Sequence, residues 1–340
     1  MSEERRQRLT FAVLAALLPA GMAAAVALGS VPLPLSGVVS SLLSSLGAGG
    51  STLDATGEVI LWSVRLPRVA LAALVGGGLA MVGACLQSVF RNPMADTGLL
   101  GVSGGAAFGA VLAVRLGWAS EVFLALTLAA FVGAMTAVLA VYVLAHASGR
   151  ASLHGLLLTG LAVSALAGAG TSVLLVATDE FRVKTVLFWL AGGLEGRGST
   201  HLGLASAFVL TGCAFLLLLS RPLDVLSLGT EEAAALGLPV SRTRVTVLGL
   251  CALVAGACTA VAGSVPFVGL VAPHALRPLV GPRGRYLLPA SFLGGAVLVV
   301  LADLLSRATS ARIDLPLGAL TAFVGAPYFL VALRGSEGRS

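Results

Sequence analysis

Long apolar runs follow one another along almost the whole 340-residue chain. Residues 11–29 and 122–145 are examples, and each is close to the roughly 20 residues that a helix needs to cross a bilayer. Only 11% of the residues are charged, against about 25% in a soluble domain, so water-facing material is too scarce to cover these runs. Alternating segments of about ten residues, typical of a membrane barrel, do not occur in the sequence. We therefore predict an all-α polytopic membrane protein.

The runs divide the chain into ten expected transmembrane helices within a single domain, residues 1–340. They cover residues 11–29, 69–89, 97–114, 122–145, 155–177, 201–219, 245–262, 267–280, 287–305 and 316–333. Residues 30–63, rich in Ser, Gly and Pro, are expected to form an external loop. Residues 186–194 are too short to cross and are expected to form a half-helix, and residues 220–244 form the longest internal polar loop.

The basic residues predict the orientation of these helices. If both termini are cytoplasmic, thirteen of the 21 Lys and Arg residues lie inside, as the positive-inside rule favours. The first apolar run is longer than the core of about 7–15 residues in a cleaved signal peptide, so we interpret it as a retained span. The three tryptophans, Trp62, Trp118 and Trp189, would then lie at outer ends, as in an interfacial belt.

The sequence argues against several other functions. A phosphate-binding Walker loop needs Gly-Lys followed by Ser or Thr, and the only lysine, Lys184, follows Val183. Any ATP-driven step must therefore use a separate subunit. No histidine or cysteine has metal-ligand spacing, and no catalytic constellation is recognisable, so we expect neither a metal site nor an enzyme. The basic residues are sparse and lie between apolar runs, which does not favour nucleic-acid binding.

The internal polar loop contains a short segment with helix signals. Thr230 is expected to cap it, Glu231 and Glu232 favour its positive N-terminus, and Gly237 is expected to end it. Such a helix between two spans suits docking to a partner protein. An ordinary surface helix fits the same residues, so the sequence leaves both interpretations open.

Four charged residues at outer ends of spans form a second candidate set. Arg65 and Arg68 share one helix face, where they could clamp carboxylates of an external partner or contact lipid phosphates. Asp303 lies within an apolar run, which makes it a functional candidate by default. Arg307 follows four residues later, so we favour a structural Asp–Arg pair over a proton relay.

Small residues indicate close helix packing. Gly76–Gly78, Gly83 and the four-residue spacing of Gly101, Gly105 and Gly109 suit spans whose backbones approach each other, as membrane helices do through small residues. Two Gly/Ala-rich spans are each followed by a break containing proline, at residues 91–93 and 271–274. Their opposite orientations suggest an inverted repeat.

Several ordered motifs together carry a resemblance to a known family. They are Leu28–Val31, Arg65-Leu66-Pro67-Arg68, Asn92–Ala95, Leu100–Ala106, Glu232–Gly237, Pro266–His274 with Arg277, Asp314–Gly318 and Gly325–Pro327. The chain resembles the permeases of ABC importers for iron chelates (siderophores and haem) and cobalamin. The likeness covers nearly the whole length.

The resemblance implies the type II permease fold: ten spans that work as a homodimer in the bacterial inner membrane, with the pore at the subunit interface. It implies three kinds of protein partner besides lipid: a second copy, two ATP-binding subunits that hold ATP and Mg²⁺, and a periplasmic binding protein. This chain itself would bind no cofactor.

The same resemblance assigns roles to residues of this sequence. Docking of the binding protein falls to Arg65, Arg68 and Arg307. Coupling to the ATPases falls to Glu231, Glu232, Ala233, Gly237 and Arg242, and the pore and its gate to Ser164, Thr171, Ser172 and Trp189. The implied cargo is a large iron chelate, haem or a ferric siderophore. The alternatives are cobalamin, or a proton-coupled transporter that uses Asp303.

Overall fold

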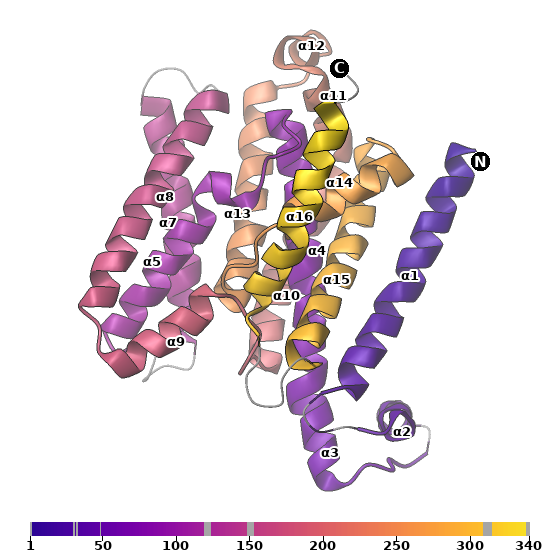
Figure 1. Ribbon diagram of the computed structural model, residues 1–340. Coiled ribbons are helices and arrows are strands. Elements are labelled where there is room, and N and C mark those ends of the chain that lie inside the picture. The colour runs from indigo at the N-terminus through magenta and orange to yellow at the C-terminus, as the bar shows by residue number, and fades with distance from the viewer. Residues whose placement is uncertain are drawn as a thin grey trace.

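The computed structural model describes residues 2–29, 31, 33–47, 49–118, 124–147, 153–308 and 315–337. Within these residues the chain is helical and contains no strand. Figure 1 shows the long helices running side by side as a bundle. Both ends of the chain lie at the end of the bundle that carries α12, and α2 and α3 lie at the opposite end. We refer to these as the α12 end and the α2 end.

Each of the ten predicted spans corresponds to a helix. They are α1 (Glu3–Ala27), α4 (Leu66–Phe90), α5 (Val102–Arg115), α7 (Ala125–Ala147), α8 (Leu153–Val176), α10 (Ser199–Leu218), α13 (Val240–Ala262), α14 (Val268–Val280), α15 (Gly284–Ala308) and α16 (Leu317–Glu337). In the described part of the chain, seven helices are long and apolar enough to cross a membrane, and α5, α14 and α16 have shorter apolar stretches. The prediction of an all-helical, many-span membrane protein is confirmed.

Shorter helices connect the spans: α2 (Leu35–Ser45), α3 (Ala55–Val59), the π-helix η1 (Ile60–Arg65), the 3₁₀-helix η2 (Thr97–Leu100), α9 (Glu180–Leu190), α11 (Ser220–Leu228) and α12 (Thr230–Ala235). The elements α3, η1 and α4 continue into one another as a single rod of 36 residues. At 1.5 Å per residue this rod is about 54 Å long, whereas the hydrocarbon core is about 30 Å thick. The α3 segment therefore projects beyond the other helices at the α2 end (Figure 1).

Helix α4 forms the centre of the bundle, with α10, α13, α14 and α15 packed around it. Glycines make this possible, as the sequence predicts. A methyl group on Gly83 would lie 1.8 Å from the carbonyl oxygen of Gly269, and one on Gly76 would lie 2.2 Å from that of Gly295. The backbones of α14 and α15 thus touch α4 directly, which is how membrane helices gain van der Waals contact.

Helices α5, α7 and α8 form a second packed group beside this centre. A methyl group on Gly105 would lie 2.4 Å from the Gly133 carbonyl oxygen, so α5 and α7 also meet backbone to backbone. Helix α8 covers one side of α5, but only 11% of its most apolar window is buried. A broad apolar face of α8, including Leu166 and Val176, has no cover from the described chain.

The half-helix differs from its predicted bounds. It begins at Glu180, six residues before the expected start at 186, because Asp179 adopts the extended N-cap conformation and its carbonyl oxygen accepts the amides of Arg182 and Val183. Glu180 in the first turn favours the helix N-terminus. The helix ends at Leu190, residue 191 forms a turn, and residues 192–194 have no regular secondary structure.

The three tryptophans of the predicted belt differ in exposure, and the belt itself stays a prediction. Trp62 and Trp118 are exposed, as an interfacial position requires. Trp189 is only 8% exposed, because α9 turns it into the protein interior.

The predicted inverted repeat has one local counterpart in the structure. The short helices α5 and α14 each follow a residue in the left-handed conformation, Gly101 with φ 77° and Phe267 with φ 67°. This conformation is uncommon only for Phe267, because glycine adopts positive φ readily, so the shared turn does not by itself establish the repeat. The repeat itself stays a prediction.

Candidate functional site

At the α2 end, arginines from two other helices complete the C-terminus of α1. A helix ends with carbonyl oxygens that lack an intrahelical partner, and cations are favourable there. Arg65 Nη1 donates to the carbonyl oxygens of Val26 at 2.5 Å and Ala27 at 3.0 Å. Arg307 Nη2 donates to that of Ala25 at 2.9 Å. Arg65 is only 5% exposed, so this contact uses its side chain fully.

A buried ion-pair triad lies beside this helix end. Asp303 is 1% exposed, and its Oδ1 accepts from Arg68 Nε at 2.9 Å. Its Oδ2 accepts from Arg307 Nε at 3.1 Å. The predicted Asp303–Arg307 pair is confirmed. Arg68 is the partner that the sequence did not indicate, because it stands on α4, 235 residues away in the chain.

The three arginines that we expected to dock a partner therefore lie close together: Arg68 and Arg307 in the triad, and Arg65 at the adjoining end of α1. Most of their donor groups bond within the chain, and the side chains of Arg68 and Arg307 are only 13% and 10% exposed. Their first role is to tie α1, α4 and α15 together at the α2 end. Docking through their remaining exposed edge stays a prediction.

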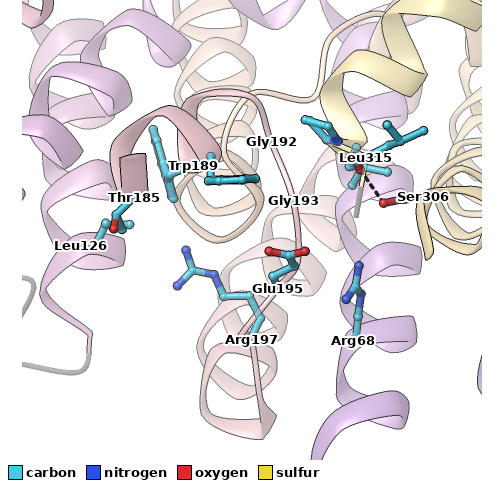
Figure 2. A pocket seen from close by; sticks show the side chains of 13 residues that line it. Arg68, Leu126, Thr185, Trp189, Gly192, Gly193, Glu195, Arg197, Ser306 and Leu315 are labelled. Atoms are coloured by element: carbon cyan, nitrogen blue, oxygen red, sulfur yellow. Dashed lines mark hydrogen bonds between the residues drawn. The ribbon is translucent and has the colours of Figure 1, made fainter. Parts of the chain in front are cut away.

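A cavity of about 330 Å³ opens next to this cluster. It is bounded by the end of α9, the chain after it, and the adjoining ends of α15 and α16. Figure 2 shows Arg68, Glu195 and Arg197 along one side of it and Trp189 above them. Charged side chains of both signs therefore line this cavity at the α2 end together with apolar ones such as Phe188 and Leu317.

Arg197 anchors the chain that follows α9. Its Nε donates to the carbonyl oxygen of Val261 at 3.0 Å, and its Nη1 reaches Thr127 Oγ1 at 3.5 Å and His201 Nε2 at 3.2 Å. Burial lowers the pKa of Arg197 from its ordinary value, yet an arginine stays charged at any physiological pH. The α9–α10 connection is therefore bonded to α7, α10 and α13 at once.

Helix α9 is also joined to its neighbours through backbone bonds. The amide of Gly193 donates to the carbonyl oxygen of Ala262 at 2.8 Å, and that of Leu317 donates to Gly192 at 2.8 Å. Gly192 has φ 79° and Gly263 φ 68°, and a methyl group on either would lie about 2 Å from a facing carbonyl oxygen. The end of α9 is thus tied to the end of α13 and the start of α16.

The predicted pore residues on α8 do not share one surface. Thr171 is buried and donates to its own helix at the Ala167 carbonyl oxygen, 2.8 Å away. The Ser164 hydroxyl is also buried and has no hydrogen-bond partner among the described atoms. Ser172 is exposed and donates to the Gly168 carbonyl oxygen at 3.1 Å. Their role in a pore stays a prediction.

At the α12 end, the predicted cap of the short loop helix is wrong. Helix α12 begins at Thr230, and Gly229, with φ 144°, occupies the N-cap position without a side-chain cap. Thr230 Oγ1 instead accepts from Arg244 Nη2 at 3.3 Å. Glu231 and Glu232 lie in the first turn, as expected, and both are exposed.

The predicted end of α12 is confirmed. Gly237 has φ 80°, and its amide donates to the carbonyl oxygen of Ala234 at 2.9 Å. The amide of Leu238 donates to that of Ala233 at 3.0 Å, which completes a Schellman motif. Ala233 is buried, so α12 is fixed on one side. Its exposed side, with Glu231, Glu232 and Leu236, and the exposed Arg242 form an open surface at this end.

Side chains that the sequence did not indicate join this end together. Asp224 on α11 accepts the amide of Gly284, the first residue of α15, at 2.6 Å. Gln7 Nε2 on α1 donates to the carbonyl oxygen of Val280 at the end of α14, at 2.8 Å. Helix α15 is therefore held by Asp224 at the α12 end and by the Asp303 triad at the α2 end. The only sign of these contacts in the sequence is that polar residues stand near the ends of the helices.

Possible metal ligands lie apart from one another in the described ranges of the chain. Among the described residues, no group of three or more His, Cys, Asp or Glu side chains comes together. The four cysteines, Cys85, Cys213, Cys251 and Cys258, are buried and free. The polar residues described above instead form contacts between helices at the two ends of the bundle.

Comparison with known proteins gives consistent matches. The FecCD transport family matches residues 17–335. The chain is 44% identical to the cobalamin import system permease protein of Halobacterium salinarum, over 84% of this chain and 76% of the relative. It is 40% identical to the hemin transport system permease protein of Yersinia pestis, over 85% and 87%. It is 36% identical to the Fe(3+)-citrate import system permease protein of Bacillus subtilis, over 98% and 96%.

A solved structure shares the fold of the chain. It is an inward-facing conformation of a metal-chelate type ABC transporter, with a TM-score of 0.85 and 31% identity. The match covers 96% of this chain and 99% of the other. The bundle, its short helices and its connecting helices therefore belong to a known transporter architecture.

Proposed function

The chain belongs to the FecCD transport family and is an ABC importer permease, and we propose that its cargo is a large iron chelate, haem or a ferric siderophore. The match of residues 17–335 to one transport family supports the permease function, and the relatives named for hemin and Fe(3+)-citrate support the iron chelate. Cobalamin is the second candidate, because a cobalamin permease is among the relatives at 44% identity. All three cargoes are large metal chelates.

The partners follow from surfaces that the chain leaves open. Two ATP-binding subunits would supply ATP and Mg²⁺, and the exposed side of α12 with Glu231, Glu232 and Leu236 is the surface on which they would act. A second copy of the chain would cover the exposed apolar faces of α8 and α16, represented by Leu166 and Phe323. The α12 end would then face the cytoplasm of a bacterial cell, with both termini there.

A binding protein would deliver the cargo at the α2 end. The exposed edges of Arg68 and Arg307, and the mixed charges of the adjoining cavity, offer it polar contacts. Carboxylates on its surface would pair with these guanidiniums, and such charge complementarity steers association.

The contacts between helices suggest how a shift of α12 reaches the α2 end of the bundle. ATP binding would bring the ATPase subunits together and shift α12 and α11. Asp224 would carry that shift into α15, and the triad would carry it on to α1 and α4. The joint between α9, α13 and α16 would move the half-helix with the bundle. The permease pair would thus rock between inward-open and outward-open forms as packed units.

Reconstitution tests the proposal. The chain is placed in liposomes with its ATPase subunits and binding protein, and uptake of radiolabelled haem, a ferric siderophore and cobalamin is compared with and without ATP. We expect ATP-dependent uptake of an iron chelate. Uptake of cobalamin alone would assign the second cargo. Uptake driven by a proton gradient without ATPase subunits would contradict the whole proposal and favour a secondary transporter.

Docking is tested separately by charge reversal. Arg68→Glu should weaken binding-protein association at low salt. Arg115→Glu, an exposed arginine at the end of α5 outside the cluster, is the matched control. Because Arg68 also bonds to Asp303, the thermal stability of each variant is measured alongside its affinity. Unchanged affinity in a folded Arg68→Glu variant would contradict docking at this edge.

A further inference from the structure

Helix α2 presents one apolar face that nothing in the described chain covers. Leu35, Val39, Leu42 and Leu46 follow a spacing of i, i+4, i+7 and i+11, which places them on one side of the helix and its last turn. Their exposed fractions lie between 36% and 82%. We call these four residues the α2 stripe.

The opposite face of α2 is fixed to the protein. Ser41 Oγ donates to Glu58 Oε2 at 2.9 Å and accepts from Trp62 Nε1 at 3.0 Å. Hydrogen bonds from Ser51 and then Ser41 lower the pKa of Glu58, so the carboxylate that holds this face is charged at neutral pH. The rotation of α2 about its axis is therefore set, and the α2 stripe points away from α3.

Helix α1, next to α2 in the chain, also carries exposed apolar side chains. Leu9, Val13 and Leu17 on α1, and Leu28 just after it, are all about half exposed. In Figure 1, α2 lies just beyond the end of α1 and is seen close to end-on, while α1 runs lengthwise. The axis of α2 thus crosses that of α1, which places α2 roughly parallel to the membrane plane.

The absence of charge distinguishes lipid from a protein partner. Residues 9–53 contain no Asp, Glu, Lys or Arg. Surfaces that recruit a protein from water use charge to steer the encounter, and arginines do so elsewhere at this end. An uncharged apolar stripe beside a lipid-facing helix instead fits the boundary between headgroups and acyl chains. Trp62 donates a hydrogen bond to Ser41 of α2, and tryptophan is enriched at the boundary between membrane and water.

We propose that α2 is an interfacial helix whose Leu35, Val39, Leu42 and Leu46 lie in the lipid leaflet at the α2 end. It would anchor the long connection between α1 and α4 on the bilayer surface. Because α2 carries no basic residue, its affinity comes from buried apolar area and does not require anionic lipid. The proposal depends on the membrane location of the chain and not on its cargo.

Spin labels on the two faces of α2 test the proposal. Val39→Cys and Leu46→Cys place a label on the stripe, and Ser44→Cys places one on the other side as the matched control. The four native cysteines are buried and leave the introduced thiol as the reactive one. The full-length chain is put into nanodiscs of uncharged phosphatidylcholine. Collisions of each label with oxygen, which enters the bilayer, are compared with collisions with a water-soluble nickel chelate.

We expect the ratio of oxygen to nickel collisions to be several-fold higher at the stripe than at position 44, with little change on adding anionic lipid. Equal ratios on both faces would overturn the proposal. Disulfide cross-linking of Val39→Cys between two copies would assign the stripe to a dimer contact instead. Shielding that develops only after the binding protein is added would assign it to that partner. Val39 and Leu46 are exposed and Ser44 is half-buried, and circular dichroism of each labelled variant checks that the fold is retained.

Discussion

Replacing Asp303 tests how the α2 end of the bundle is held together. Asp303→Asn keeps the shape of the side chain but removes its charge and replaces one acceptor oxygen with an amide nitrogen. That nitrogen would face a guanidinium of Arg68 or Arg307, both donors, so one of the two hydrogen bonds becomes a donor–donor contact. Asp303→Ala removes both bonds and leaves two largely buried guanidiniums without this partner.

The structure sets the size of the effect. A hydrogen bond to a charged group contributes about 1.5–3 kcal/mol, and Asp303 makes two of them at 2.9 and 3.1 Å. Breaking a buried pair costs about 3–5 kcal/mol, which agrees with that sum. We therefore expect Asp303→Ala to lower the free energy of unfolding by about 3–5 kcal/mol, and Asp303→Asn by about half as much.

The chain provides its own control. Asp179 and Arg182 are 3.9 Å apart, with side chains 76% and 44% exposed, and an exposed pair contributes about 0–1 kcal/mol. Asp179→Asn, Asp303→Asn and Asp303→Ala are purified in mild detergent, and unfolding is followed by circular dichroism as a denaturing detergent is titrated in. Loss of stability should rise in that order.

Two results would refute the reasoning. If Asp303→Asn is no less stable than Asp179→Asn, the triad does not hold the α2 end. If Asp303→Asn stays fully stable and ATP-driven uptake continues but proton movement stops, the acid carries protons and our structural assignment is wrong.

Three further outcomes follow from local contacts. Serine hydroxyls lower the pKa of Glu58 in the folded protein. Its contribution to the α2–α3 contact is therefore full above the pKa of the unfolded state and is lost as the pH falls through the lower pKa of the folded state. The fluorescence of Trp62 should change in that acidic range and not at neutral pH. Asp224→Ala should lower the melting temperature through the loss of a helix cap of about 0.5–2 kcal/mol, whereas Asp224→Asn, which keeps an acceptor, should lower it less. Gly83→Ala should cost about 3 kcal/mol, since the added methyl meets the Gly269 carbonyl oxygen at 1.8 Å, and the yield of folded protein in detergent should fall; a normal yield would contradict that contact.

Features that depend on neighbouring residues could be predicted from the sequence. The spans follow from apolar runs of membrane length, and each run forms a helix. The end of α12 at Gly237 needs only a residue that tolerates positive φ. The Asp303–Arg307 pair follows from a four-residue spacing on one helix. In each case the determining atoms lie within one or two turns of the chain.

Features that depend on distant residues could not be predicted in this way. Arg68 pairs with Asp303 across 235 positions, and nothing in the sequence of α4 selects that partner. Thr230 had a suitable side chain for a cap, but Arg244 on α13 binds it. The residue patterns suggested that Trp189 belongs to an interfacial belt, whereas the packing of α9 buries its side chain. Tertiary contacts decide such positions, and local propensity does not.

The arginines that complete the end of α1 have a consequence for biosynthesis. Arg307 bonds to Ala25 and Leu28 across 282 and 279 positions. A ribosome makes about 5–20 residues per second, so α1 waits in the membrane for tens of seconds before that partner is made. Arg65 can bond to Val26 and Ala27 much earlier, because it follows them by only 39 and 38 residues, so the contacts that wait for Arg307 are those that join α1 to α15.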